Sequence, residues 1–154
     1  MHRNVKIASI AAGIAVGAAV AWPVAAQYAK PEDAVKYRKA VFTVMNSHMG
    51  RIFGQLKSTT PNMQVIQSSA QTVEPMSKLP WDAFAANTEM VNDTRALPAL
   101  FKSEAKAKDL AQKMQEEVTK LNTVAKTGDA AAIRTQFGVA AKTCDNCHDD
   151  FRAK

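Results

Sequence analysis

Cys144-Asp145-Asn146-Cys147-His148 is the stretch that constrains this chain most, and it lies close to the C-terminal end. Two thiols at positions i and i+3, followed directly by an imidazole, form the pattern of c-type haem attachment. Residues three apart lie on the same face of a helix, so both sulfurs can bond to one edge of a haem. The adjacent imidazole can then bind the iron as an axial ligand. The motif predicts one covalent haem c, held by Cys144 and Cys147, with His148 as the metal ligand.

Three other chemistries use cysteines at this spacing. A structural zinc site needs four nitrogen or sulfur ligands, and the other two histidines, His2 and His48, lie far away in the sequence. A thioredoxin-like redox pair belongs at a helix N-terminus, whereas this pair ends a long helical pattern. A plain disulfide between the two cysteines remains the simple alternative.

The first 26 residues have the composition of a secretory signal peptide. Arg3 and Lys6 form a basic start, residues 7–21 form an apolar run, and small residues at 24–26 offer a cleavage site. The run is short for a membrane span of about 20 residues. We expect residues 1–26 to be removed, which leaves residues 27–154 as one domain without membrane insertion. A periplasmic location is consistent with haem attachment, because c-type haem is attached outside the bacterial cytoplasm.

The whole 154-residue chain has a formal net charge of +6, and its Lys and Arg residues alternate with Asp and Glu rather than forming runs. Such a mildly basic, mixed surface does not indicate nucleic-acid binding. It is compatible with a weak preference for acidic partners.

Apolar side chains recur at helical spacing and predict four amphipathic helices. The four stripes are Arg38, Phe42, Met45, Met49, Ile52 and Leu56; Met63, Ile66, Ala70 and Val73; Ala107, Leu110, Met114, Val118, Leu121 and Val124; and Ile133, Phe137, Ala140, Cys144, Cys147 and Phe151. The haem cysteines therefore lie on the core-facing stripe of the last helix. Four helices with two short connections and one long one predict an all-α fold, an antiparallel four-helix bundle with covalently bound haem.

Residues that start or stop helices mark the ends of these segments. Pro31 suits a first helical turn, and Thr60-Pro61 suits the start of the second helix. Pro75 predicts a kink or an early stop. Gly128 is expected at C′ of the third helix, and Asp129 as the N-cap of the fourth.

The long connection from Leu79 to Pro98 shows no sustained periodicity. It contains prolines and asparagines, yet it also carries Trp81 and Phe84, which favour packing against the rest of the protein. Long connections in small domains are often functional. We expect this one to fold back over the haem edge.

Taken together, these features resemble the cytochrome c′ family, over nearly the whole predicted mature chain. The matching positions are Lys36-Tyr37-Arg38, Met45, His48-Met49-Gly50, Leu79-Pro80-Trp81, Phe84, Phe137-Gly138, the motif at 144–148 and Phe151-Arg152. The resemblance implies a haem bound by His on one face only, with NO and CO as ligands. It also implies a homodimer through the first two helices, and a physiological role in NO binding or electron transfer with the redox partner left open.

Phe42 determines the coordination that the resemblance implies. The family places this position over the open iron face, usually with Leu in five-coordinate members and with Met in low-spin relatives. Phe can neither ligate iron nor donate a hydrogen bond. The sequence therefore predicts high-spin, five-coordinate iron. Met45 and Met49 leave an alternative open, a low-spin, six-coordinate His/Met electron carrier of the cytochrome c-556 type. Enzymatic turnover is not expected, because the stripe offers Phe and Met rather than a titratable group.

Five further residues are candidate cofactor contacts. Arg38 is expected to bind a haem propionate, since a buried carboxylate favours a charge-assisted donor. Lys39 and Asp93 resemble positions near the haem edge. Trp81 could direct its indole N–H to a propionate or simply pack in the core. Arg152 would flank the face of the haem that carries His148, or complement the helix dipole.

Overall fold

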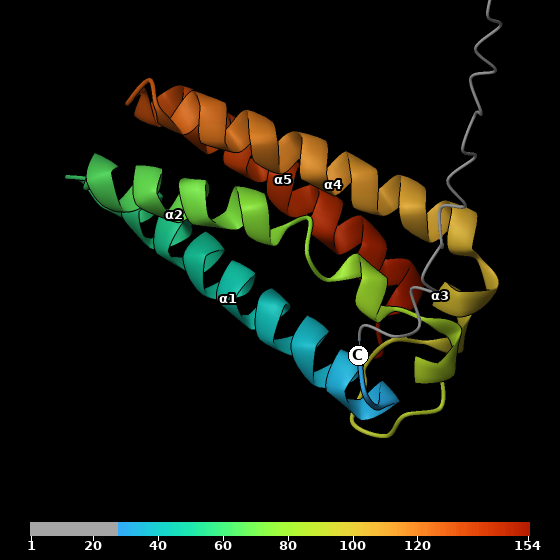
Figure 1. Cartoon of the computed structure of the whole chain (residues 1–154). Helices are drawn as coiled ribbons and strands as arrows, with labels where there is room; N and C mark the ends of the chain where they lie inside the picture. Colours follow the sequence, from blue (N-terminus) through green and yellow to red (C-terminus); the bar gives the residue numbers. More distant parts are fainter. Residues whose placement is uncertain (1–27) are drawn as a thin grey trace, which may run out of the picture.

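Four long helices and one short helix make up most of the described chain, residues 28–154 of the computed structural model (Figure 1). They are α1 (Pro31–Lys57), α2 (Met63–Met76), α3 (Pro98–Lys102), α4 (Glu104–Ala125) and α5 (Ala130–Phe151). The helix α1 runs beside α2, and α4 beside α5, while α2 also packs on α4. No β-strand occurs in residues 28–154, so the predicted all-α four-helix bundle is confirmed. The expected signal peptide, residues 1–26, lies outside the described residues.

The join between α1 and α2 differs slightly from the prediction. As expected, α1 begins at Pro31 with acidic residues in its first turn. The N-cap of α2 is Asn62 rather than Thr60, because the Asn62 Oδ1 atom accepts a hydrogen bond from Val65 N at 3.2 Å. Pro75 lies in the last turn of α2, which ends one residue later, so the predicted early stop is confirmed.

The join between α4 and α5 follows the predicted turn chemistry. The Asp129 carboxylate accepts hydrogen bonds from Ala131 N (2.9 Å) and Ala132 N (3.1 Å), which makes it the predicted N-cap of α5. Gly128 has a φ of 72°, a left-handed conformation that glycine adopts without steric cost. Gly128 was predicted at C′, but it occupies C″, because the C-cap of α4 is Lys126.

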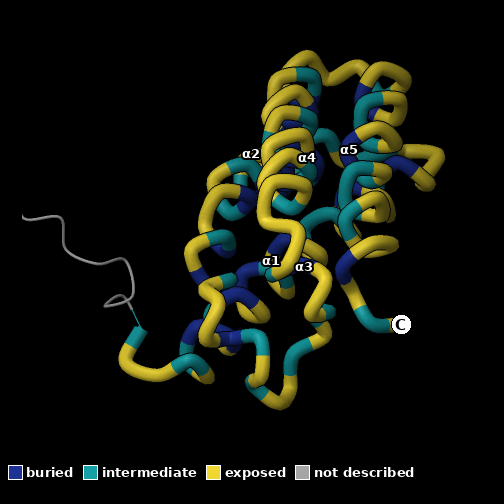
Figure 2. Tube along the Cα trace, turned by 90° about the vertical axis from the view of Figure 1, so that its right-hand side faces the viewer, coloured by how far each residue is buried: buried dark blue, intermediate teal, exposed yellow. Residues whose placement is uncertain are grey.

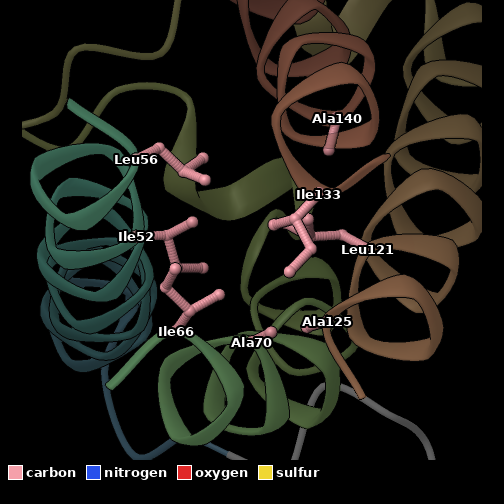
Figure 3. Close-up of a cluster of buried hydrophobic side chains, with 8 residues drawn as sticks. All are labelled: Ile52, Leu56, Ile66, Ala70, Leu121, Ala125, Ile133 and Ala140. Carbon is pink, nitrogen blue, oxygen red and sulfur yellow. The ribbon is translucent and has the colours of Figure 1, made fainter. Parts of the chain in front are cut away.

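Two clusters of buried side chains hold the four helices together. The tip cluster, at the end of the bundle where α1 joins α2 and α4 joins α5, contains Ile52, Leu56, Ile66, Ala70, Leu121, Ala125, Ile133 and Ala140 (Figure 3). The motif-end cluster contains Val41, Met45, Val73, Met114 and Val118. Figure 2 shows the buried positions along the inward sides of the helices and exposed residues along the outer sides. The predicted stripes thus form the core.

The connection between α2 and α3, residues 77–97, lies across the end of the bundle where α1 begins and α5 ends (Figure 1). The sequence predicted no regular structure there, but it contains two short 3₁₀ helices, η2 (Trp81–Ala83) and η3 (Ala86–Thr88). Both pack against α1, and α3 packs against α5. The connection therefore lies between the start of the first helix and the end of the helix that carries the motif.

Within residues 28–154, none of the helices is long and apolar enough to cross a lipid bilayer.

Candidate haem site

The last turns of α5 carry Cys144, Cys147 and His148 in one continuous helix. Both thiols are half-buried, and His148 is exposed. Because the two cysteines are three residues apart on a regular helix, they lie on the same side of α5. The structure thus gives the motif the arrangement that two thioether bonds to one haem edge require.

The two thiols are unlike those of a redox-active pair. Burial raises the pKa of the Cys144 thiol above its ordinary value, and burial likewise raises the pKa of Cys147. A thioredoxin-like pair has a thiol with a lowered pKa at a helix N-terminus, so that reading does not fit α5. Residues 28–154 contain no group of three or more His, Cys, Asp or Glu side chains that could hold a metal ion.

The surroundings of His148 favour the neutral imidazole, which is the form that binds metals. Burial lowers the pKa of the imidazole, and the positive charges of Arg152 and Arg95 lower it further, against the opposing effect of Asp145. The Arg152 amide donates to the His148 carbonyl at 3.0 Å and closes the last turn of α5. The surroundings thus favour ligation of iron by His148.

An apolar region adjoins the thiols. Cys144 packs against the motif-end cluster, together with the partly buried side chains of Tyr37, Phe42, Met49, Met76 and Trp81. A haem joined to Cys144 and Cys147 would lie against these side chains, which suit an apolar macrocycle. With two thiols, an adjacent imidazole and this apolar neighbourhood, the residues present fit a covalent haem.

Phe42 is enclosed by aromatic rings from the connection. Its ring meets Trp81 edge to face, with centroids 6.0 Å apart and planes at 81°, and it meets Phe84 at 6.2 Å and 58°. Trp81 and Phe84 stack on each other at 6.0 Å and 26°. The predicted position of Phe42 over the iron is not tested by these contacts, but they show that its partly buried ring packs against the connection.

Arg38 is buried, and its guanidinium has three protein acceptors. Its Nη1 atom donates to the carbonyl of Ala83 (2.6 Å) and to Thr88 Oγ1 (2.8 Å), and its Nη2 atom donates to Thr94 Oγ1 (2.9 Å). The guanidinium also lies 4.3 Å from the Phe84 ring centroid. Burial lowers the pKa of Arg38 to about 10. These contacts fasten the connection to α1, while the predicted propionate contact stays a prediction.

Two of the other predicted residues pair with each other, and a third has a hydrogen-bond partner within the protein. Lys39 Nζ lies 2.6 Å from Asp93 Oδ2, so these two exposed side chains form an ion pair with each other. The indole N–H of Trp81 donates to the Ser77 carbonyl at 2.7 Å, at the end of α2. The partly buried Trp81 side chain also packs against the motif-end cluster, and its contact with a haem stays a prediction.

The end of the connection is joined to the chain just after the motif. Ala96 and Arg152 form an antiparallel bridge, flanked by hydrogen bonds from Leu97 N to the Phe151 carbonyl (2.9 Å) and from Ala153 N to the Arg95 carbonyl (2.8 Å). Arg152 is exposed there, four residues after His148. No pattern in the sequence indicated this pairing, or Thr88 as an acceptor for Arg38.

Comparisons with known proteins agree on one family. The family model described as Cytochrome C' matches residues 33–152. The chain is 38% identical to cytochrome c' of Alcaligenes xylosoxydans xylosoxydans, over 83% of this chain and 99% of that protein. It superposes on a nitric oxide complex of a cytochrome c prime mutant from Alcaligenes xylosoxidans, with a TM-score of 0.76 and 36% identity, over 83% of this chain and 100% of that one. A cytochrome c' with an unusual ligand-controlled dimer dissociation gives a TM-score of 0.77 and 27% identity, over 81% and 98% of the two chains. With its C-terminal Cys-Asp-Asn-Cys-His motif and its four-helix bundle, the chain belongs to the cytochrome c′ family, whose members carry covalently attached haem c.

Proposed function

We propose that the chain is a periplasmic haem c protein whose iron is five-coordinate and high-spin, with His148 as its one protein ligand, and that it binds NO and CO on the face covered by Phe42. The observation that carries this proposal is the packing of a non-ligating Phe42 in the apolar region beside Cys144. The similarity to a cytochrome c prime that was crystallised with nitric oxide supports the choice of ligand.

In this function Cys144 and Cys147 hold the haem, and His148 orients it. When bound, the haem supplies an iron with one open coordination position. Phe42, Trp81 and Phe84 exclude water from that side, because their rings pack on one another.

Hydrogen-bond donors near Phe42 are directed elsewhere, which favours NO and CO over O₂. The Trp81 indole N–H is donated to Ser77, and the Arg38 guanidinium donates to acceptors on the connection. Bound O₂ gains most from a nearby donor, since it takes up negative charge. We therefore expect O₂ to bind poorly, or to oxidise the iron.

A low-spin, six-coordinate electron carrier is the second candidate. Met45 is 7% exposed and belongs to the motif-end cluster, and Met49 packs against the same cluster as Cys144. Thioethers in this region favour the candidate only if one of them reaches the iron. A methionine at helical spacing in a core is usually a packing residue, so we rank this function below the first.

The remaining features of the proposal concern location and assembly. Residues 1–26 act as a signal peptide for export, and the chain binds ligands and passes electrons rather than catalysing a reaction. It forms a homodimer through α1 and α2. The exposed apolar side chain of Val44 on α1, 40% exposed, supports that surface. A related cytochrome c' with ligand-controlled dimer dissociation supports the same assembly.

The test is the rate of CO binding to the reduced Phe42→Ala variant, followed by stopped-flow absorbance. Moving a ring out of packed surroundings costs roughly 1–3 kcal/mol, so the variant should bind CO about tenfold faster or more. Phe53→Ala, an equal truncation on the same helix where the ring stacks on Phe137, is the control and should leave the rate unchanged. Equal rates for the wild type and Phe42→Ala would overturn the proposal.

A further inference from the structure

The Phe42 ring does not stand alone on α1. Its two aromatic neighbours, Trp81 and Phe84, both belong to the connection, and each of the three rings contacts the other two. Phe42 therefore cannot leave its position without breaking contacts with residues about 40 positions later in the chain. The place of the Phe42 ring depends on the place of the connection.

Polar contacts from α1 fix the connection at the same point. Arg38 lies one turn before Phe42 on the same face of α1, and it donates to Ala83, Thr88 and Thr94. These acceptors lie before, within and after η3, so one guanidinium ties together most of the connection. The Arg38 contact with the Phe84 ring joins this polar set to the aromatic one.

Further contacts hold both ends of the connection. At its start the Trp81 indole is anchored to the Ser77 carbonyl at the end of α2. Towards its end Lys39 pairs with Asp93, and the bridge between Ala96 and Arg152 attaches it to the end of α5. The connection thus begins directly after α2 and is fastened to α1 and α5, and the aromatic rings lie between these points.

We propose that Trp81 and Phe84 are positioning residues for Phe42, and that the contacts of Arg38 with Thr88 and Thr94 hold them in place. Displacement of the Phe42 ring by an incoming diatomic ligand then requires the connection to loosen, and the strength of its attachment sets the binding rate. This inference rests on the proposed function, in which Phe42 covers the iron. It adds that control of ligand entry lies in the connection and not only in the Phe42 side chain.

The first experiment is a double-mutant cycle on CO association, with Phe84→Leu made in the wild-type and in the Phe42→Ala backgrounds. Phe84→Leu should speed CO binding about two- to tenfold in the wild type, the range that one aromatic contact is worth, and should have no effect once Phe42 is absent. The matched control is Phe53→Leu, which makes the same change in the stacked pair of Phe53 and Phe137 and should leave the rate unaltered.

The outcomes separate this inference from the proposed function. If Phe42→Ala speeds binding but Phe84→Leu does not, the inference fails and the role of Phe42 stands. If Phe84→Leu speeds binding equally in both backgrounds, Phe84 acts without Phe42, and the inference also fails. If neither substitution changes the rate, Phe42 does not cover the iron, and the proposed function fails first.

The second experiment loosens the connection without touching a ring. Thr94→Val removes an acceptor of Arg38, and Thr123→Val is its control, because the Thr123 hydroxyl bonds only within α4. Thr94→Val should speed amide hydrogen exchange between residues 83 and 94, measured by mass spectrometry, and should also speed CO binding. Faster exchange with an unchanged CO rate would overturn the inference. Thr94→Val also tests the inference if Phe84→Leu yields no haem-loaded protein.

Discussion

Lys39 on α1 and Asp93 on the connection form an ion pair, with Lys39 Nζ 2.6 Å from Asp93 Oδ2 and 3.1 Å from the Asp93 carbonyl oxygen. The resemblance to the family had pointed to each residue separately, as a neighbour of the haem edge. In the structure each has the other as its partner, and the pair attaches the connection to α1 beside Arg38. A contact of either side chain with the haem stays a prediction.

Asp93 combines this ion pair with a left-handed backbone, since its φ is 69°. Asp93→Asn removes the charge but keeps a residue that tolerates this conformation, so it should lower the free energy of unfolding by less than about 1 kcal/mol. Asp93→Ala should cost about 1–2 kcal/mol more, because alanine adopts this backbone only with strain. Urea unfolding of the two variants measures the order. Equal losses would show that the backbone conformation is not a constraint.

Haem attachment makes a second prediction. Intact-mass measurement of the exported protein should give a polypeptide that starts at Gln27 plus one haem, and the haem should survive acid extraction because the two thioethers are covalent. The double variant with Cys144→Ser and Cys147→Ser should lose the haem on extraction. A protein with two unmodified thiols, or with a Cys144–Cys147 disulfide and no haem, would contradict the whole assignment.

Long helices and their buried faces could be predicted from the sequence because burial repeats with the helical period. Leu121 and Ile133 were identified in this way, and both are fully buried. The connection could not be predicted in the same way, since 3₁₀ turns of three residues leave no periodic pattern. Its position depends on single contacts, such as Arg38 with Thr88, between residues 50 positions apart.

The hydrogen-bond partners of the polar side chains at the site could not be predicted from the sequence either. A buried arginine near a haem suggests a propionate as its acceptor, but three groups on the connection accept from Arg38. The Trp81 indole presents the same case, because a carbonyl four residues earlier is close enough to accept its N–H. The motif itself was predictable, since its chemistry depends only on local spacing along one helix.

Coordination of the iron gives the third prediction. With His148 as the one protein ligand, the ferric protein at neutral pH should show a high-spin or spin-mixed absorption spectrum. Met45→Leu keeps the volume of this buried side chain and should leave the spectrum unchanged. A low-spin spectrum with a methionine-to-iron charge-transfer band, lost in Met45→Leu or in Met49→Leu, would establish the six-coordinate electron carrier instead.

A fourth prediction concerns the contribution of Arg38 to stability. Arg38→Met keeps most of the side-chain volume but leaves the Ala83 carbonyl and the hydroxyls of Thr88 and Thr94 without their donor. Leaving buried groups unpaired costs about 1–3 kcal/mol, so the free energy of unfolding should fall by about that amount. Arg51→Met, at an exposed position on the same helix, should change it by less than about 0.5 kcal/mol. Similar losses in the two variants would mean that the Arg38 contacts do not hold the connection.

Glu117 makes the contact between α4 and α5 sensitive to pH. Its carboxylate accepts hydrogen bonds from Lys120 Nζ (2.7 Å) and from Gln136 Nε2 on α5 (2.7 Å), and these two bonds, the first the stronger, lower the pKa of Glu117. A carboxyl group whose pKa is lower in the folded protein contributes stability above its unfolded pKa and loses it as pH falls through the folded value. Glu117→Gln should therefore reduce the free energy of unfolding at neutral pH, by under about 1 kcal/mol for such a solvated group. The difference from the wild type should shrink steadily when urea unfolding is repeated at pH values below about 4, near the ordinary range for this group.

Glu116→Gln is the matched control, because Glu116 pairs with Gln112 of its own helix and does not bridge to α5. A loss in Glu117→Gln that stays constant from neutral to acid pH would show that the charge of Glu117 does not stabilise the contact.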